Sequence, residues 1–342
     1  METEIILVTE ENLDEVVQKA TKLLKNGELV GMPTETVYGL AANAFDKDAV
    51  KKIYKAKGRP ADNPVIVHIS DFVMLRDIAE VNEIALELAK EFWPGPLTLV
   101  LNKKPSISDE ITCSLPTVAV RMPSNYISHA VISAADVPLA APSANLSGKP
   151  SSTTAKHVFD DFFGKIPLIL DGGPSELGIE STVVSVVGEK PVLLRPGMIT
   201  LEMLATIAPD IQLSNSIFEE LESGKPVESP GIKYKHYSPN AEVILVKGSL
   251  EGFIRHLKTL THGNICAMCF DTEQEKIPIP SISYGDINDH FSQGRRLFSA
   301  LRMVDKLGSS KVYVRVTEDE GDYLAIYNRL LRAASFKVIE VE

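Results

Sequence analysis

The segment 55–69 places three cations directly before a run of apolar residues. Lys55, Lys57 and Arg59 lie within five residues, next to a glycine and two prolines, and Val65–Ile69 follows them. The apolar run predicts a strand that must be buried. Cations held at a rigid turn beside a buried strand indicate an anion-binding site inside a fold, and not a solvated tail.

The size and composition indicate a globular protein with more than one domain. The chain has 342 residues, of which 44% are hydrophobic and 24% are charged, and this length suffices for two domains of ordinary size. No apolar run reaches the roughly 18 residues that span a bilayer. The acidic start, Met1–Glu4, lacks the basic region of a signal peptide. We therefore expect a cytoplasmic location and no membrane partner.

The net charge of −11 disfavours bulk nucleic-acid binding, which depends on a surplus of cations. A local basic pocket for a small polyanion remains compatible with it. The three cysteines, Cys113, Cys266 and Cys269, argue against a disulfide framework. Cys266 and Cys269 have CxxC spacing inside an apolar run. Without a second CxxC, we predict that they are small core residues and not metal or redox groups.

Short apolar runs alternate with segments of helical periodicity along most of the chain, which predicts an α/β fold. The C-terminal hundred residues repeat this pattern without a recognisable catalytic constellation, and we assign Gly294–Arg296 to a helix surface. Strands are predicted near 5–8, 29–32, 64–69, 97–101, 117–121, 139–142, 166–170, 182–186, 192–195, 243–246, 265–270 and 312–316, and helices near 12–26, 46–55, 82–92, 155–163, 249–260, 290–307 and 321–335.

Two polar loops follow predicted strands, where α/β folds carry ligand-binding groups. Pro33–Leu40 contains two threonines, a carboxylate and a phenol between a proline and a glycine. Leu139–Thr154 combines serines and threonines with Asn145 and Gly148 before a helix, a ready anion cradle, although it lacks the Walker A pattern. The alternatives are a turn in which threonines satisfy the backbone and simple helix N-capping.

Two predicted strands each end in an arginine, and a proline stands at the next position or at the one after it. Arg121 shares one face of its strand with Thr117, and it could hold a carboxylate or form a surface salt bridge. Arg195 stands before Pro196 in the same way. His68, inside a strand, is either a satisfied core residue or a ligand contact.

A linker is predicted at Gly224–Gly231, from its glycines and prolines. The aromatic and basic segment Ile232–Pro239 follows it. Its lysines and tyrosines are either surface residues or part of the site.

With these motifs, the chain resembles the threonylcarbamoyl-AMP synthases, a family built on a YrdC-like domain, in their long two-domain form. The segments that carry the resemblance are Pro33–Leu40, Lys57–Pro60, Asn63–Pro64, Trp93–Thr98, Val120–Pro123, Ala141–Gly148, Ser181–Val183, Leu194–Gly197 and Ser229–Pro239.

The resemblance implies a reaction in which L-threonine, bicarbonate (or CO2) and ATP give threonylcarbamoyl-AMP and pyrophosphate, for the modification of adenosine 37 in tRNA. It also implies a twisted open mixed α/β sheet around a central basic cavity, followed by a smaller C-terminal α/β Rossmann-like domain. The expected boundaries are 1–205 for the catalytic domain, 206–240 for a linker or lid, and 241–342 for the C-terminal domain.

The resemblance also implies residue roles, with no protein nucleophile and no metal-ligating side chains. Magnesium is expected with ATP, and the tRNA threonylcarbamoyl-transfer machinery is an implied partner. The expected threonine-binding residues are Thr36, His68, Arg121, Ala141 and Ser181; the expected ATP-binding residues are Arg59, Asn63, Thr117, Ser143, Ser151, Arg195 and Tyr234; and Lys55 and Lys57 are expected to add charge near the phosphates.

The segment Tyr234–Tyr237 is expected to fold over the occupied cavity as a lid. Two other functions compete with this interpretation. One is an RNA- or tRNA-binding module that uses the same basic cavity, and the acidic balance weighs against it. The other is a carbamoyl transferase of the hydrogenase-maturation type, and the lack of paired CxxC motifs weighs against it.

Overall fold

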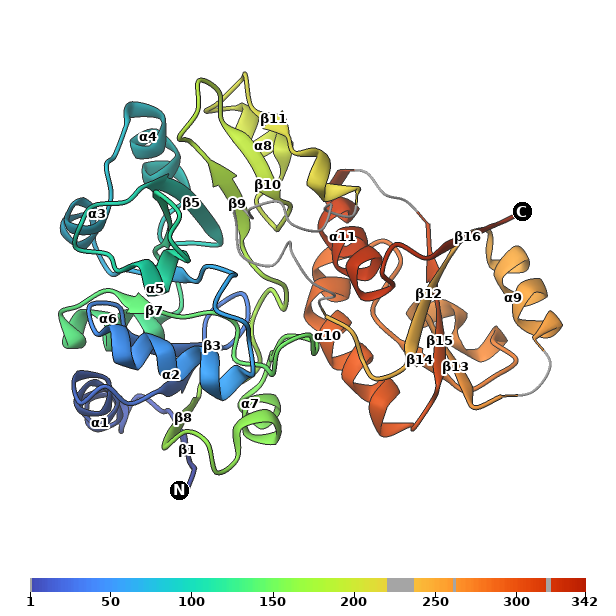
Figure 1. Cartoon of the computed structure of the whole chain (residues 1–342). Helices are drawn as coiled ribbons and strands as arrows, with labels where there is room; N and C mark the ends of the chain where they lie inside the picture. Colours follow the sequence, from blue (N-terminus) through green and yellow to red (C-terminus); the bar gives the residue numbers. More distant parts are fainter. Residues whose placement is uncertain (1, 220–236, 261–262, 318–320) are drawn as a thin grey trace.

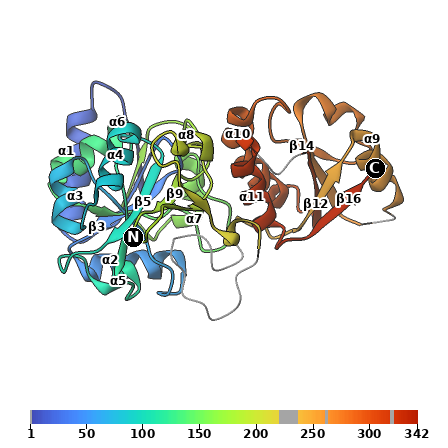
Figure 2. The ribbon, with the colours of Figure 1, turned by 90° about the horizontal axis from the view of Figure 1, so that it is seen from above.

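The structure is a computed structural model that describes residues 2–219, 237–260, 263–317 and 321–342. Its secondary structure forms two sheets, and helices accompany each of them. The two sheets lie side by side in both views (Figures 1 and 2). None of the described helices is long and apolar enough to cross a membrane.

The first sheet is mixed and contains eleven of the described strands. In space their order is β1-β8-β2-β3-β7-β4-β6-β5-β9-β10-β11, with parallel and antiparallel pairs in the same sheet. The predicted mixed α/β sheet is therefore confirmed. The strands are β1 (Glu4–Leu7), β2 (Val30–Met32), β3 (Gly39–Asn43), β4 (Ile66–His68), β5 (Leu97–Asn102), β6 (Thr117–Arg121), β7 (Leu139–Ala140), β8 (Leu168–Asp171), β9 (Thr182–Ser185), β10 (Val192–Arg195) and β11 (Gln212–Leu213).

Helices α1 to α8 accompany this sheet (Figure 1). Helix α2 shows how the sequence positions a site residue: Asp46 caps its first turn, Val50 and Ile53 bury its apolar face, and Gly58 ends it in a left-handed conformation. The helices are α1 (Leu13–Lys25), α2 (Lys47–Lys57), α3 (Phe72–Ile78), α4 (Glu83–Phe92), α5 (Asp109–Thr112), α6 (Tyr126–Ala135), α7 (Ala155–Phe162) and α8 (Leu201–Ala205), with the 3-10 turn η1 (Asn215–Ile217).

The second sheet is parallel and forms the core of the C-terminal domain, with the spatial order β14-β13-β15-β12-β16. This order differs from that of dinucleotide-binding domains. Cys266 and Cys269 are buried in β13, as predicted. The elements are β12 (Glu242–Gly248), α9 (Leu250–Thr259), β13 (Ile265–Cys269), η2 (Asp271–Lys276), β14 (Ser281–Ser283), α10 (His290–Lys306), β15 (Lys311–Val316), η3 (Gly321–Tyr323), α11 (Leu324–Ala333) and β16 (Val338–Val341).

Helices α10 and α11 turn toward the first domain (Figure 2). The assignment of Gly294 to a helix surface is wrong, because Gly294 is buried against Gly178: a Cβ built on Gly178 would lie 2.5 Å from the Gly294 carbonyl oxygen. Arg295 and Arg296 are exposed, as predicted. Two glycines thus permit a close approach of the two domains.

Candidate functional site

A cavity of about 640 Å³, including its open mouth, lies where several loops of the first domain meet Tyr237. Nine of the residues expected to bind substrates line it, although they come from segments far apart in the sequence. These are Thr36, Arg59, His68, Arg121, Ala141, Ser143, Ser151, Ser181 and Arg195.

Arg121 lies at the end of β6, beside His68 of β4. Its Nη1 donates to Thr36 Oγ1 at 2.7 Å and its Nε to the Gly95 carbonyl at 3.2 Å. Its Nη2 lies 2.6 Å from Glu35 Oε1, although outside hydrogen-bond geometry. Both charged side chains are only 4% exposed, so the alternative of a surface salt bridge is wrong for Arg121. A buried arginine that lines the cavity beside the Thr36 hydroxyl suits a carboxylate ligand.

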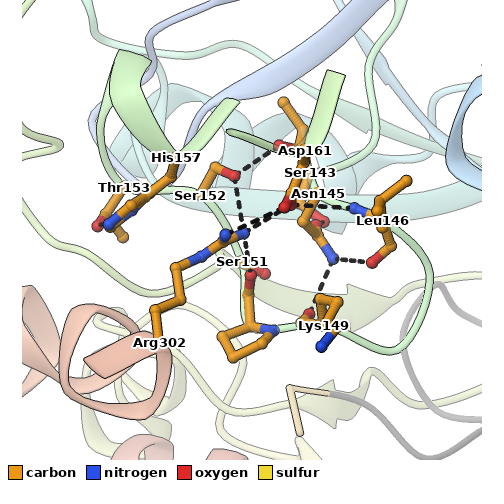
Figure 3. Close-up of polar contacts among 12 residues, drawn as sticks. Ser143, Asn145, Leu146, Lys149, Ser151, Ser152, Thr153, His157, Asp161 and Arg302 are labelled. Carbon is orange, nitrogen blue, oxygen red and sulfur yellow. Dashed lines mark hydrogen bonds and ion pairs between the residues drawn. The ribbon is translucent and has the colours of Figure 1, made fainter. Parts of the chain in front are cut away.

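Lys57 organises the loop that follows β7. Its Nζ donates to the Ser143 carbonyl at 2.5 Å and to the Asn145 carbonyl at 2.6 Å. The Ser143 hydroxyl donates to Asn145 Oδ1 at 2.6 Å, and the Asn145 amide donates to the Lys149 carbonyl at 2.9 Å (Figure 3). Burial lowers the pKa of Lys57 well below its usual value. The loop is therefore a connected polar network, and helix capping alone does not explain its hydroxyls.

Arg195 and Arg59 complete the cationic lining. Arg195 donates from Nε to the Ser181 carbonyl at 3.1 Å and from Nη2 to Ser181 Oγ at 3.2 Å. Arg59 donates from Nη2 to the carbonyls of Asn63 and Pro64, both at 2.9 Å. Burial lowers the pKa of both arginines. These contacts fix the guanidinium groups. Arg59, Arg121 and Arg195 therefore line the cavity in positions that do not depend on a ligand to order them.

Comparisons with known proteins agree along the whole chain. A family model described as telomere recombination (Sua5_yciO_yrdC) matches residues 22–197, and the threonylcarbamoyl-AMP synthase C-terminal domain (Sua5_C) matches residues 199–335. A threonylcarbamoyl-AMP synthase of Pyrococcus abyssi is 43% identical, covering 98% of this chain and 99% of the relative. The chain belongs to the threonylcarbamoyl-AMP synthase (Sua5) family.

Other relatives agree with this placement. A Bacillus subtilis threonylcarbamoyl-AMP synthase is 44% identical, covering 95% of each chain. The crystal structure of the P. abyssi Sua5 protein complexed with L-threonine matches with a TM-score of 0.90 at 42% identity, covering 99% of this chain and 100% of that one. The family therefore extends over both domains of this chain.

Four of the expected site residues of this family member do not line the cavity. Lys55 is exposed at a separate cavity with Glu28 and Lys52. Lys57 is buried beneath the loop it binds. Asn63 is buried, and its carbonyl, not its amide, contacts Arg59. Thr117 begins β6, at the opposite end from Arg121, and Tyr234 lies outside the described residues.

Two residues that line the cavity, Tyr237 and Glu180, were not among the expected substrate-binding residues. Tyr237 lines the cavity, is 4% exposed and packs its ring 5.1 Å from that of Phe298 in the C-terminal domain. Its burial raises its pKa. Tyr237 belongs to the segment Tyr234–Tyr237, which was predicted to act as a lid. For Glu180, the sequence offered no sign of a place in the cavity beyond its position next to Ser181. Whether the segment moves as a lid stays a prediction.

The described residues include no cluster of three or more His, Cys, Asp or Glu side chains that could hold a metal ion. Among the described residues that line the cavity, the carboxylate is that of Glu180, which accepts a hydrogen bond from Ser151 Oγ and pairs with Arg329. Because a hydroxyl and an arginine already bind the two oxygens of this carboxylate, it does not offer the open oxygen ligands that magnesium prefers.

The stability of this Sua5 family member is expected to depend on pH through His68. Burial, followed by the charge of Arg121, lowers the pKa of His68 from 6.5 to about 3. Between these values the unfolded state binds a proton that the folded state excludes, so stability falls as the pH drops, by up to about 1.4 kcal/mol per pH unit.

Urea unfolding at about pH 6.5, 5.5 and 4.5 measures this slope, with the wild type and His68→Gln compared. The variant is expected to have the shallower slope, since it has lost the titrating group. Equal slopes in the two proteins would show that His68 is not the group responsible.

Proposed function

We propose that this chain synthesises threonylcarbamoyl-AMP from L-threonine, bicarbonate and ATP, with release of pyrophosphate. The observation that carries the proposal is the convergence of Arg59, Arg121 and Arg195 on one buried cavity in a chain of this family. The names of the relatives support this synthesis, and not an RNA-binding module that uses the same cavity. The product would supply the threonylcarbamoyl group for adenosine 37 of tRNA, through a transfer machinery that remains a proposed partner.

We propose that L-threonine binds on the Arg121 side of the cavity, with its carboxylate on the Arg121 guanidinium. Thr36, His68, Ser181 and the backbone at Ala141 surround that position. The low pKa of His68 keeps its imidazole neutral at neutral pH, so it can accept or donate a hydrogen bond there without adding charge.

ATP is proposed to bind toward Arg59, Ser143, Ser151 and Arg195, whose charges and hydroxyls suit phosphates. The cavity is thus proposed to be basic in net character. Magnesium would be held chiefly by the triphosphate, where it would neutralise the phosphate charge, because the Glu180 carboxylate of the cavity already pairs with Arg329.

The proposed reaction needs no protein nucleophile. The amine of threonine forms a bond to the carbon of bicarbonate, with loss of water, and gives N-carboxy-threonine. A carboxylate oxygen of that group then attacks the α-phosphorus of ATP, and the bond from that phosphorus to pyrophosphate breaks. Three anionic groups must meet, so the fixed arginines act by positioning and by charge stabilisation.

The test is to incubate the protein with labelled bicarbonate, L-threonine, ATP and magnesium. Label is expected in a threonylcarbamoyl-adenylate, with one pyrophosphate released per labelled product. Omission of threonine should abolish both signals. Pyrophosphate release that does not depend on threonine, or RNA binding without any labelled product, would contradict the proposal. Residence in the cytoplasm stays a prediction.

A further inference from the structure

A carboxylate on the wall of a cavity that binds anions needs a compensating charge. Glu180 is such a residue: it lines the cavity and is 7% exposed. Its Oε1 accepts a hydrogen bond from Ser151 Oγ at 2.5 Å. Without a cation, its charge would oppose a triphosphate across a short, poorly hydrated distance.

The compensating cation comes from the other domain. Arg329 of α11 is 0% exposed, and its Nε donates to Glu180 Oε2 at 3.1 Å. Its Nη2 donates to the Glu180 carbonyl at 3.0 Å, and its Nη1 donates to the Pro196 carbonyl. One guanidinium therefore holds Glu180, directly before Ser181, and Pro196, directly after Arg195. Ser181 and Arg195 are two of the expected substrate-binding residues.

A second arginine of the C-terminal domain holds the other side of Ser151. Arg302 of α10 donates from Nη2 to the Pro150 carbonyl at 2.7 Å, to Ser152 Oγ at 3.2 Å and to Asp161 Oδ2 at 2.8 Å. Figure 3 shows the Arg302 side chain extending from its helix toward this loop. The segment 150–152 is thus held directly by α10 and, through Glu180, by α11.

We propose that Arg329 is a positioning residue of the substrate cavity, which neutralises Glu180 and holds Ser151 and Arg195 in place for the nucleotide. The proposal rests on the proposed function, and it assigns the C-terminal domain a direct part in that site. A planar fork with several fixed donors is required, because the acceptors are one carboxylate and two separate carbonyls.

The experiment measures ATP and threonine affinity by calorimetry on four full-length proteins: wild type, Arg329→Met, Arg329→Met with Glu180→Gln, and Asn328→Ala. Asn328 is a matched control because it lies on the same helix, is 2% exposed and donates to the Ile217 carbonyl across the domain boundary, but not to a cavity residue. Urea unfolding of each protein reports its stability separately.

Arg329→Met is expected to weaken ATP binding at least about tenfold, because an unpaired carboxylate is left in the cavity. The double variant, which also removes that carboxylate, should recover most of the loss. Threonine affinity should change less than about threefold in both, and Asn328→Ala should bind ATP like the wild type.

An Arg329→Met variant that binds ATP like the wild type would overturn the proposal, as would a double variant no better than the single one. If Arg329→Met does not fold, Arg329→Lys replaces it. The lysine keeps the charge without the fork, and it should weaken ATP binding about threefold to tenfold; unchanged binding would overturn the proposal. A wild-type protein that does not bind ATP would instead refute the proposed function.

Discussion

Replacement of Arg121 by methionine is expected to abolish measurable threonine binding and to lower the free energy of unfolding by about 3–5 kcal/mol. The binding loss is expected because the Arg121 guanidinium is the proposed carboxylate ligand. The stability loss is expected because Glu35, 2.6 Å away and 4% exposed, would keep a buried charge without its partner. Calorimetry with threonine and urea unfolding measure the two effects.

Two further variants separate binding from stability. Arg121→Met combined with Glu35→Gln should regain most of the lost stability, since no unpaired charge remains, but it should not regain threonine binding. Arg59→Met should weaken ATP binding and leave threonine binding close to that of the wild type, because Arg59 lies with the proposed phosphate groups. If Arg121→Met bound threonine normally, the threonine site would have to lie elsewhere.

Replacement of Gly178 by alanine is expected to cost at least about 3 kcal/mol of stability. Gly178 has a φ of +74°, and an added Cβ would lie 2.4 Å from the Arg295 Cα and 2.5 Å from the Gly294 carbonyl oxygen. Backbone atoms of the other domain cannot turn away as a side chain can. The variant must therefore separate α10 from the first domain or strain both.

Gly173→Ala is the matched control for this prediction. Gly173 has a similar φ of +79°, but an added Cβ would meet nothing within 4 Å. Its replacement should cost only the strain of a left-handed alanine, about 1 kcal/mol. Urea unfolding compares the two variants, and similar losses for both would mean that the domain contact at Gly178 contributes little.

Many elements and most cavity residues could be predicted because their signals are local, although the helix α6 and the strand β3 were not predicted. Alternation placed Arg121 on the face of a strand, and Pro123 and Pro196 marked where two strands end. The serines and threonines grouped between β7 and α7 indicated a loop that binds an anion and does more than cap the helix. By contrast, the short edge strands β14 and β16 carry too few residues for a period to emerge, and they were not predicted.

The interpretation of the lysines shows where local signals fail. Lys55 and Lys57 are two residues apart, so on a helix they point in different directions. One is exposed at another cavity, and the other is buried against two carbonyls of a loop 86 and 88 residues away. Charge composition alone could not distinguish a solvated lysine from one that organises a loop.

The sequence by itself determined the α/β class, the family and the three arginines that line the cavity, because those depend on periodicity and on short motifs. Only the tertiary structure decided which distant groups these arginines contact and that the C-terminal domain reaches the site. Glu180 and Arg329 are 149 residues apart, and a buried ion pair of this kind depends on packing between domains. No local sequence pattern indicates which distant side chain will be packed against a given charged group and desolvate it.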